Sequence, residues 1–246
     1  MMLRLVLVII LKFELVICQE DMRNPMETQP PSPEFENLCM KLSSGLHFDK
    51  SLLLNTTWVS IYSWSRDVGY GCPTLQFSKP TLKQKQKFYK NMRDRLETQP
   101  NWKSAKLLMT LRNFDKKTES LLTSISRGYK GSFEAVPNLD ILQLYGTDVD
   151  EKIPLFSFTL QLLQTNDAEC KNQLFLFFLF CKVGVVLYTK VDKQCPTLKL
   201  INKVVSSAGL PDGQYTCKRY LNSTLADRNV SGSSSESEEN LEDDHS

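Results

Sequence analysis

Residues Asn55–Arg66 read NTTWVSIYSWSR. From Thr57 onward the stretch mixes aromatic and β-branched residues, which are enriched in strands. A turn of small residues precedes Trp58, and Cys72 follows the stretch. The segment therefore predicts that the first strand of a β-rich domain begins at Trp58.

Further segments carry strand signals, because short alternating runs separated by turn residues are typical of a barrel or sandwich. We expect strands at Leu75–Ser78, Lys106–Phe114, Ser120–Ser126, Gly131–Val136, Leu139–Tyr145 and Ile153–Leu163. The segment Pro80–Lys103 instead places apolar residues near helical spacing among lysines and arginines. This pattern predicts a short amphipathic helix or a long loop.

Two later segments, Leu174–Phe180 and Val185–Tyr188, are apolar on both faces. A strand of this kind needs cover on both sides. The segment Pro196–Ala208 repeats apolar residues at helical spacing, and Gly209 follows where a helix C-terminal glycine belongs. We therefore predict a helix packed on the outer face of these two strands.

The cysteines indicate disulfide bonds in an oxidising compartment. Cys18 lies in the expected signal peptide, which leaves Cys39, Cys72, Cys170, Cys181, Cys195 and Cys217. Such a set predicts disulfides, and the sequence leaves the connectivity open. A hairpin turn centred between Lys182 and Val183 would place Cys170 opposite Cys195, within disulfide reach. Because no cysteines have CxxC spacing, we expect no metal site.

The chain divides into four segments. Residues 1–18 combine an early positive charge with a short apolar run and predict a signal peptide. Residues 19–36 are rich in proline and predict a disordered arm. Residues 37–221 form one domain, and the acidic, serine-rich residues 222–246 predict a disordered tail. Because no apolar run is long enough to span a bilayer, we expect a secreted protein.

Asn55, Asn222 and Asn229 lie in Asn-x-Ser/Thr sequences, which predict glycosylation in a secreted glycoprotein. The net charge of the chain is +2, but the acidic tail offsets a basic body. Basic residues crowd the segment 79–95, which indicates either a solvated surface or an anionic partner such as heparin or lipid headgroups. No nucleic-acid-binding motif accompanies them, so we expect no nucleic-acid partner.

Catalytic motifs are lacking in the sequence. The histidines are His47, before the first strand, and His245, in the tail, so a histidine base inside the domain is not expected. No P-loop, GxGxxG or GxSxG sequence is present. We therefore expect a binding protein and not an enzyme.

With these elements in place, the chain resembles a divergent lipocalin of the insect and arthropod type, similar to apolipoprotein D and bilin-binding proteins. Phe48-Asp49 and Thr56-Thr57-Trp58 resemble the first family signature, with Thr56 where the family has glycine. Thr165-Asn166-Asp167 resembles the second signature, and Lys190 stands where the family has arginine. The resemblance covers about Cys39 to Cys217. It implies an all-β fold: an eight-stranded antiparallel up-and-down barrel with a C-terminal helix packed outside.

The resemblance also implies roles for individual residues. Trp58 would close the barrel floor, and Lys190 would pack over it in a cation–π contact. The family's disulfides imply the pairs Cys39–Cys181 and Cys72–Cys217. The remaining pair is Cys170–Cys195, which the hairpin also proposed.

An eight-stranded barrel can hold one small ligand, such as an apolar molecule or pigment, and we expect no other cofactor. Alternation selects as inward candidates Trp64, Met109, Leu111, Phe133, Tyr145, Phe156 and Phe158. The leading hypothesis is a secreted carrier of a small hydrophobic molecule. The alternative is a filled barrel, a protease inhibitor or polyanion binder, that acts through its loops and the basic segment 79–95. A haem carrier would need Tyr62 or Tyr145 as its iron ligand.

Overall fold

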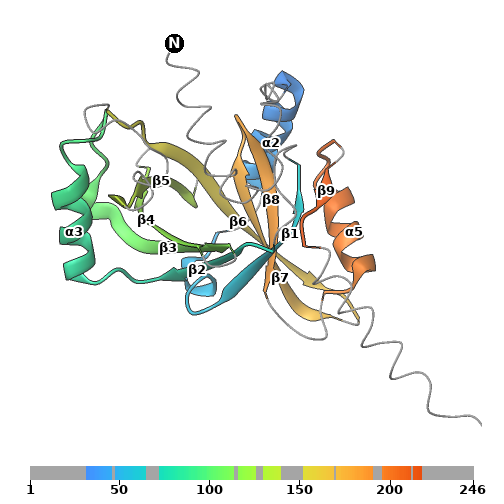
Figure 1. Ribbon diagram of the computed structural model, residues 1–246. Coiled ribbons are helices and arrows are strands. Elements are labelled where there is room, and N and C mark those ends of the chain that lie inside the picture. The colour runs from blue at the N-terminus through green and yellow to red at the C-terminus, as the bar shows by residue number, and fades with distance from the viewer. Residues whose placement is uncertain are drawn as a thin grey trace, which may run out of the picture.

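The chain forms a closed barrel of antiparallel strands with helices on its outer surface (Figure 1). The computed structural model describes residues 32–45, 48–64, 72–113, 116–125, 130–139, 152–168, 170–190, 196–211 and 213–217. Its barrel strands are β1 (Thr57–Ser63), β2 (Thr74–Ser78), β3 (Ala105–Asn113), β4 (Lys116–Ser124), β5 (Ser132–Pro137), β6 (Phe156–Asn166), β7 (Lys171–Phe180) and β8 (Gly184–Lys190).

The order of the strands closes the sheet on itself. Each strand from β2 to β7 pairs antiparallel with the next one along the chain. Strand β1 then pairs with β8 on one side and with β2 on the other, where Trp58 lies opposite Leu75. The short strand β9 (Gln214–Tyr215) pairs with the end of β1. The predicted eight-stranded antiparallel up-and-down barrel is therefore confirmed.

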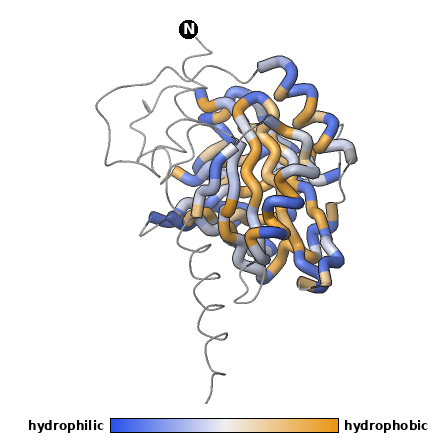
Figure 2. The backbone as a smooth tube through the Cα atoms, turned by 90° about the vertical axis from the view of Figure 1, so that its right-hand side faces the viewer, coloured by the Kyte–Doolittle hydropathy of each residue, from blue (hydrophilic) through white to orange (hydrophobic). Residues whose placement is uncertain are grey.

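Alternation along the strands separates the buried side chains into an inner cluster and two outer clusters. Successive side chains of a strand point to opposite faces of the sheet, so each strand contributes to the interior and to the outer surface. Figure 2 shows hydrophobic residues concentrated along the strands at the centre of the molecule. The outer clusters lie beneath helices, one under α3 (Leu82–Met92) and the other under α2 (Pro33–Gly45) and α5 (Leu198–Ser207).

Helix α5 (Leu198–Ser207) covers the outer face of the apolar hairpin formed by β7 and β8. The Thr197 hydroxyl accepts a hydrogen bond from the backbone N–H of Leu200 at 3.1 Å and begins the helix. After the helix, Gly209 takes a left-handed conformation with φ +65°, as expected for a C-terminal glycine. The prediction of a helix packed outside these strands is confirmed.

Helix α3 (Leu82–Met92) lies on the opposite side of the barrel from α5 (Figure 1). It begins with a capping box, in which Thr81 and Gln84 each bond the backbone N–H of the other. Phe88 and Met92 are buried against outward-facing side chains of β3, β4 and β5. The segment that the sequence left open between helix and loop is therefore a helix, preceding the single-turn helix η2 (Trp102–Ser104).

Helix α2 (Pro33–Gly45) begins inside the segment that the sequence assigned to a disordered arm. The Ser32 hydroxyl accepts a hydrogen bond from the backbone N–H of Phe35, and Pro33 occupies the first helical position. Phe35 is buried in the outer cluster shared with α5. Residues 33–36 therefore belong to the folded domain, because proline at a helix start favours order where we expected disorder.

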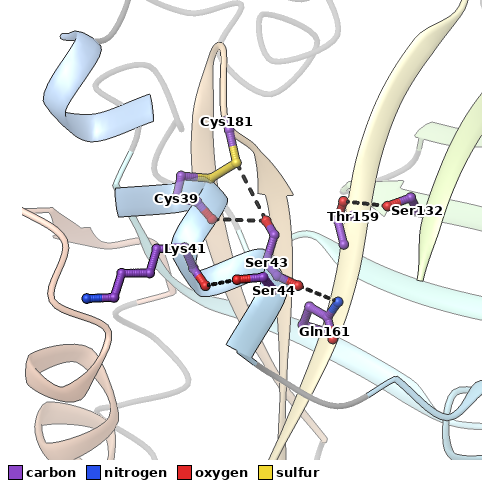
Figure 3. The surroundings of a disulfide bond; sticks show 8 residues. All are labelled: Cys39, Lys41, Ser43, Ser44, Ser132, Thr159, Gln161 and Cys181. Atoms are coloured by element: carbon purple, nitrogen blue, oxygen red, sulfur yellow. Dashed lines mark hydrogen bonds between the residues drawn. A yellow bond between two sulfur atoms is a disulfide. The ribbon is translucent and has the colours of Figure 1, made fainter. Parts of the chain in front are cut away.

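The disulfide between Cys39 and Cys181 fastens α2 to the barrel (Figure 3). Beside it, the Ser43 hydroxyl donates to the carbonyl of Cys39 at 2.9 Å. The side-chain amide of Gln161, on β6, donates to the carbonyl of Ser43, also at 2.9 Å. Together these bonds join the helix to β6 and to the turn between β7 and β8.

A second disulfide joins Cys72, before β2, to Cys217, after β9. These two bonds are the pairs that the family resemblance implied. Cys170 is also disulfide-bonded, and its expected partner Cys195 lies outside the described residues. The pair Cys170–Cys195 therefore stays a prediction.

Two details of strand pairing differ from expectation. The β7–β8 hairpin is centred on Lys182, where Phe180 pairs with Gly184, and not between Lys182 and Val183. The predicted centre of the turn was wrong by half a residue, because the sequence does not specify how many residues a turn takes up. Strand β5 pairs directly with β6, and Leu139 is helical, so the expected strand at Leu139–Tyr145 does not begin there.

Candidate functional site

The barrel interior is lined mainly by apolar side chains from all eight strands. The cross-strand partners Phe133 and Phe158 lie on this inner face, as do Phe77 and Met109. The most deeply buried members of the inner cluster are Leu53, Trp58, Leu75, Phe77, Leu107, Leu122, Leu160 and Leu176. An apolar interior of this kind can accept an apolar guest or be filled by its own side chains.

Aromatic rings form one wall of the interior. Phe158 and Phe178 are stacked, with ring centroids 4.3 Å apart. Phe180 lies 4.9 Å from Phe178 and 5.2 Å from Phe158, and Tyr188 lies 6.3 Å from Phe178. This wall is built by β6, β7 and β8, and it offers ring faces on which a flat apolar molecule could stack.

The wall built by β3 and β4 is more polar. Cross-strand pairing puts Ser120 beside Met109, Thr118 beside Leu111, and Lys116 beside Asn113, on the face that turns inward. Asn113 ends β3 and is only 5% exposed. Its side-chain nitrogen Nδ2 has no hydrogen-bond partner. A buried unpaired amide costs free energy, so it marks a place where a hydrogen-bond acceptor would be stabilised.

The opposite end of the interior, which we call the floor, is closed by residues around the start of β1. The single-turn helix η1 (Lys50–Leu52) precedes Leu53, which is fully buried. Trp58 is also fully buried, and its indole nitrogen has no hydrogen-bond partner. The ring of Phe48 packs edge-on against Phe133, with centroids 5.5 Å apart.

The predicted cavity residues separate into distinct groups. Met109, Phe133 and Phe158 belong to the inner cluster, and Leu111 is partly buried against it. Phe156 begins β6 opposite Ala135 and is half-buried. Tyr145 lies outside the described residues.

Trp64 lies elsewhere, in the outer cluster beneath α2 and α5. Its ring stacks on Phe177, an outward-facing residue of β7, at 6.1 Å. The register between β1 and β8 shifts between Ser60 and Tyr62, and this bulge adds one residue to the alternation. Simple alternation from Trp58 put Trp64 inside, so the assignment of Trp64 to the cavity was wrong.

Several inner residues were not predicted from the sequence, notably Phe77, Phe178, Phe180 and Tyr188. In β7 the apolar run Leu174–Phe180 gives no periodic signal, because both of its faces are covered. Phe77 could have been found by alternation from Leu75 within β2. Asn113 carried no sequence signal, since an asparagine at a strand end usually belongs to a turn.

The structure shows one part of the relationship predicted for Trp58 and Lys190, namely their pairing across two strands. These two residues are direct cross-strand partners on β1 and β8. Lys190 is exposed, and the cation–π contact that the described residues contain is formed instead by Arg93 over Tyr89, at 5.6 Å. The register therefore brings the pair together without the stacking contact that the resemblance implied.

The acidic side chains described on β4 and β5, Glu119 and Glu134, lie on the outer face of the barrel. Glu134 is paired with Ser157 on the outer face of β5, and partial burial raises the pKa of its carboxyl group. Within the described ranges, no group of three or more His, Cys, Asp or Glu side chains could hold a metal ion. The two histidines lie outside the described residues. No described helix is both long and apolar enough to cross a membrane.

Comparisons with known proteins give little further information. No family model and no curated protein matches the chain. Two solved structures are similar over 72% of this chain and 92% of their own: crystal structures of a protein named LTBP1 with leukotriene C4, one of them carrying a tyrosine-to-alanine mutation. Their identities are 11% and 12%, and their TM-scores are 0.37 and 0.38. The assignment of an eight-stranded barrel with an outer helix therefore rests on the strand order and on α5.

Proposed function

We propose that this protein is a secreted carrier or scavenger that holds one small hydrophobic molecule inside its barrel. The observation that carries the proposal is the inner aromatic wall, where Phe158, Phe178 and Phe180 face the interior beside Tyr188. Binding pockets for small molecules are mostly apolar, with a few polar groups that fix the orientation of the guest. The unpaired amide of Asn113 supplies one such group.

The proposal extends to the family type and the compartment. A lipocalin of the insect and arthropod type is supported by the closed eight-stranded barrel, by the outer helix α5 and by the positions of the two disulfides. Secretion is supported by the disulfides, since these bonds persist in oxidising compartments. Asn55 fits a glycan attachment site because its side chain is exposed in the turn before β1.

A role in binding and not in catalysis is supported by the chemistry of the interior. Its described polar groups include hydroxyls, the amide of Asn113, the indole N–H of Trp58 and the amine of Lys116. Acid–base catalysis most often uses a histidine or a carboxylate within hydrogen-bond reach of the reacting atoms, and these polar groups include neither. We therefore propose that a guest is held unchanged, oriented by stacking on the aromatic wall and by one hydrogen bond at Asn113.

The proposal can be tested on protein secreted from cultured cells. Native mass spectrometry should detect a one-to-one adduct with a small molecule from the medium. The purified protein should also bind the fluorescent hydrocarbon 1-ethylpyrene, and the titration should saturate at one probe molecule per protein. A protein that carries no adduct and binds no hydrophobic probe would be a filled barrel, and the carrier function would be excluded.

A pair of matched variants locates the binding event. Ala135→Leu adds three carbon atoms to the inner face of β5, opposite Phe156. Ser157→Leu adds similar bulk on the outer face of β6, where Ser157 is exposed. We expect Ala135→Leu to weaken probe binding at least about tenfold, because it fills space that the guest needs, whereas Ser157→Leu should leave it unchanged. Equal affinities for the two variants would place the guest outside the barrel.

A further inference from the structure

Helix α3 carries a row of lysines on its outward face. Phe88 and Met92 are buried on the barrel side of this helix. Lys83, Lys87 and Lys90 are exposed. With 3.6 residues per turn, these three lysines fall on one stripe that extends about 10 Å along the helix axis. The helix has no acidic residue to neutralise them.

The positive charges of these lysines lower the stability of helix α3. Lysines four or three residues apart repel each other by about 0.2–0.5 kcal/mol for each pair. Lys83 also stands in the first turn, where the helix dipole disfavours a positive charge. The capping box and the burial of Phe88 and Met92 offset this cost. The fold is therefore stable despite the lysine row and not because of it.

Among the described residues, no acidic side chain forms a salt bridge with these lysines. Across the described ranges the salt bridges are Arg93–Asp94 and Lys117–Glu119, and neither includes a lysine of α3. The row is also far from the outer helix α5, on the other side of the barrel (Figure 1). A partner that bound here would not have to enter the barrel interior.

The apolar groups near the row are too few to enter a lipid bilayer. Helices that insert into a membrane surface bury a continuous apolar face, and the apolar face of α3 is already packed on the barrel. Leu82 is 71% exposed and Tyr89 is 44% exposed. Tyr89 packs edge-on against Trp102 and lies under Arg93, so it is already held by the fold. Charge, and not apolar surface, therefore dominates this face.

We propose that the outward face of α3 is a docking surface for a linear sulfated glycan. A row of three cations over about 10 Å meets successive anionic groups of an extended chain, and each contact releases counterions. Lys79, exposed just before the helix, continues the positive surface at its N-terminal end. The proposal is independent of any guest inside the barrel.

The test uses the full chain and immobilised heparin as the probe. The variant Lys83→Gln/Lys87→Gln/Lys90→Gln removes the row. The control Lys41→Gln/Lys182→Gln/Lys199→Gln removes the same charge from exposed positions on α2, the β7–β8 turn and α5. We expect the α3 variant to bind heparin at least about tenfold more weakly at physiological salt, with a shallower dependence of log K on log salt concentration. The control should change affinity less than about twofold.

Further measurements decide the outcome. Replacing the same three residues by arginine keeps the charge and should keep heparin binding, and circular dichroism should show that all variants are folded. Ala135→Leu should bind heparin normally, which separates this surface from the barrel guest. Equal losses in the α3 variant and its control would overturn the proposal, as would no heparin binding by the unmodified chain. Stronger binding to phosphatidylserine vesicles than to heparin would assign the surface to lipid and would also overturn it.

Discussion

The ring of Phe48 lies against Gly131 at the floor of the barrel, in the space that a β-carbon on residue 131 would need. A β-carbon there would approach two ring carbons of Phe48 to 2.9 Å and the backbone oxygen of Leu160 to 2.2 Å. Gly131 also has φ +91°, a conformation that other residues rarely adopt. The glycine therefore allows the segment before β1 to close the floor.

Gly131→Ala should destabilise the protein by roughly 3 kcal/mol, because it adds a steric clash with fixed backbone to an unfavourable φ. Gly209→Ala is the matched control: its φ is +65°, but a β-carbon would meet nothing within 4 Å. The control should cost only about 1 kcal/mol. Urea unfolding of the two variants measures the difference, and equal costs would show that Phe48 is not fixed against Gly131.

The fold could be predicted from the sequence in those regions where pattern and burial agree. The helix over the β7–β8 hairpin followed from strands that are apolar on both faces, because an uncovered apolar face is unfavourable. Gly209 marked the end of that helix, because glycine readily takes the left-handed conformation that ends many helices. The implied pairs Cys39–Cys181 and Cys72–Cys217 came from family resemblance, since cysteine positions alone allow many connectivities.

The candidate site was harder to predict, because each inner residue depends on strand register. Met109, Phe133 and Phe158 were found by alternation, and they are inside. Trp64 was misplaced because a bulge in β1 reverses the alternation after Ser60, and no residue type in the sequence announces a bulge. The inner rings of β7 were missed because a strand covered on both sides has no polar face to reveal its orientation.

Trp58→Ala should unfold the protein more than it changes ligand choice. The indole is fully buried beside Leu75 at the floor, so its loss should cost about 3–5 kcal/mol. Trp58→Phe should cost less, because the indole nitrogen makes no hydrogen bond that would be lost. Thermal unfolding measures the first effect. The order of affinities for a series of hydrophobic probes, measured on Trp58→Phe, should stay unchanged; a new order would place Trp58 in the binding site.

Removing the bond between Cys72 and Cys217 should destabilise the protein by about 2–5 kcal/mol. This bond joins residues separated by 145 positions, so it strongly restricts the unfolded chain. The double variant Cys72→Ser/Cys217→Ser should lower the urea midpoint and leave the barrel strands intact by circular dichroism below the transition. A midpoint equal to that of the unmodified protein would show that the bond does not form in the secreted chain.

Glu134→Gln should make the stability of the protein less dependent on pH. Partial burial raises the pKa of the Glu134 carboxyl group in the folded state, so folding favours its protonated form. This contribution is fully present below the pKa of the unfolded chain and is lost as pH rises through the higher folded pKa. The glutamine variant should therefore be more stable than the unmodified protein at neutral pH, with the advantage disappearing near pH 4. Melting temperatures across this range test the sign.

Asn113→Leu should separate the cost of a buried amide from its use in binding. The Nδ2 group is buried without a partner, so replacing it with an apolar side chain of similar size should leave stability equal or raise it by about 1 kcal/mol. If a guest accepts a hydrogen bond from this amide, the variant should bind 1-acetylpyrene about 5–10-fold more weakly. The same variant should bind 1-ethylpyrene, which lacks the carbonyl, with unchanged affinity. Parallel losses for both probes would show that residue 113 shapes the interior and does not read the polar end of the guest.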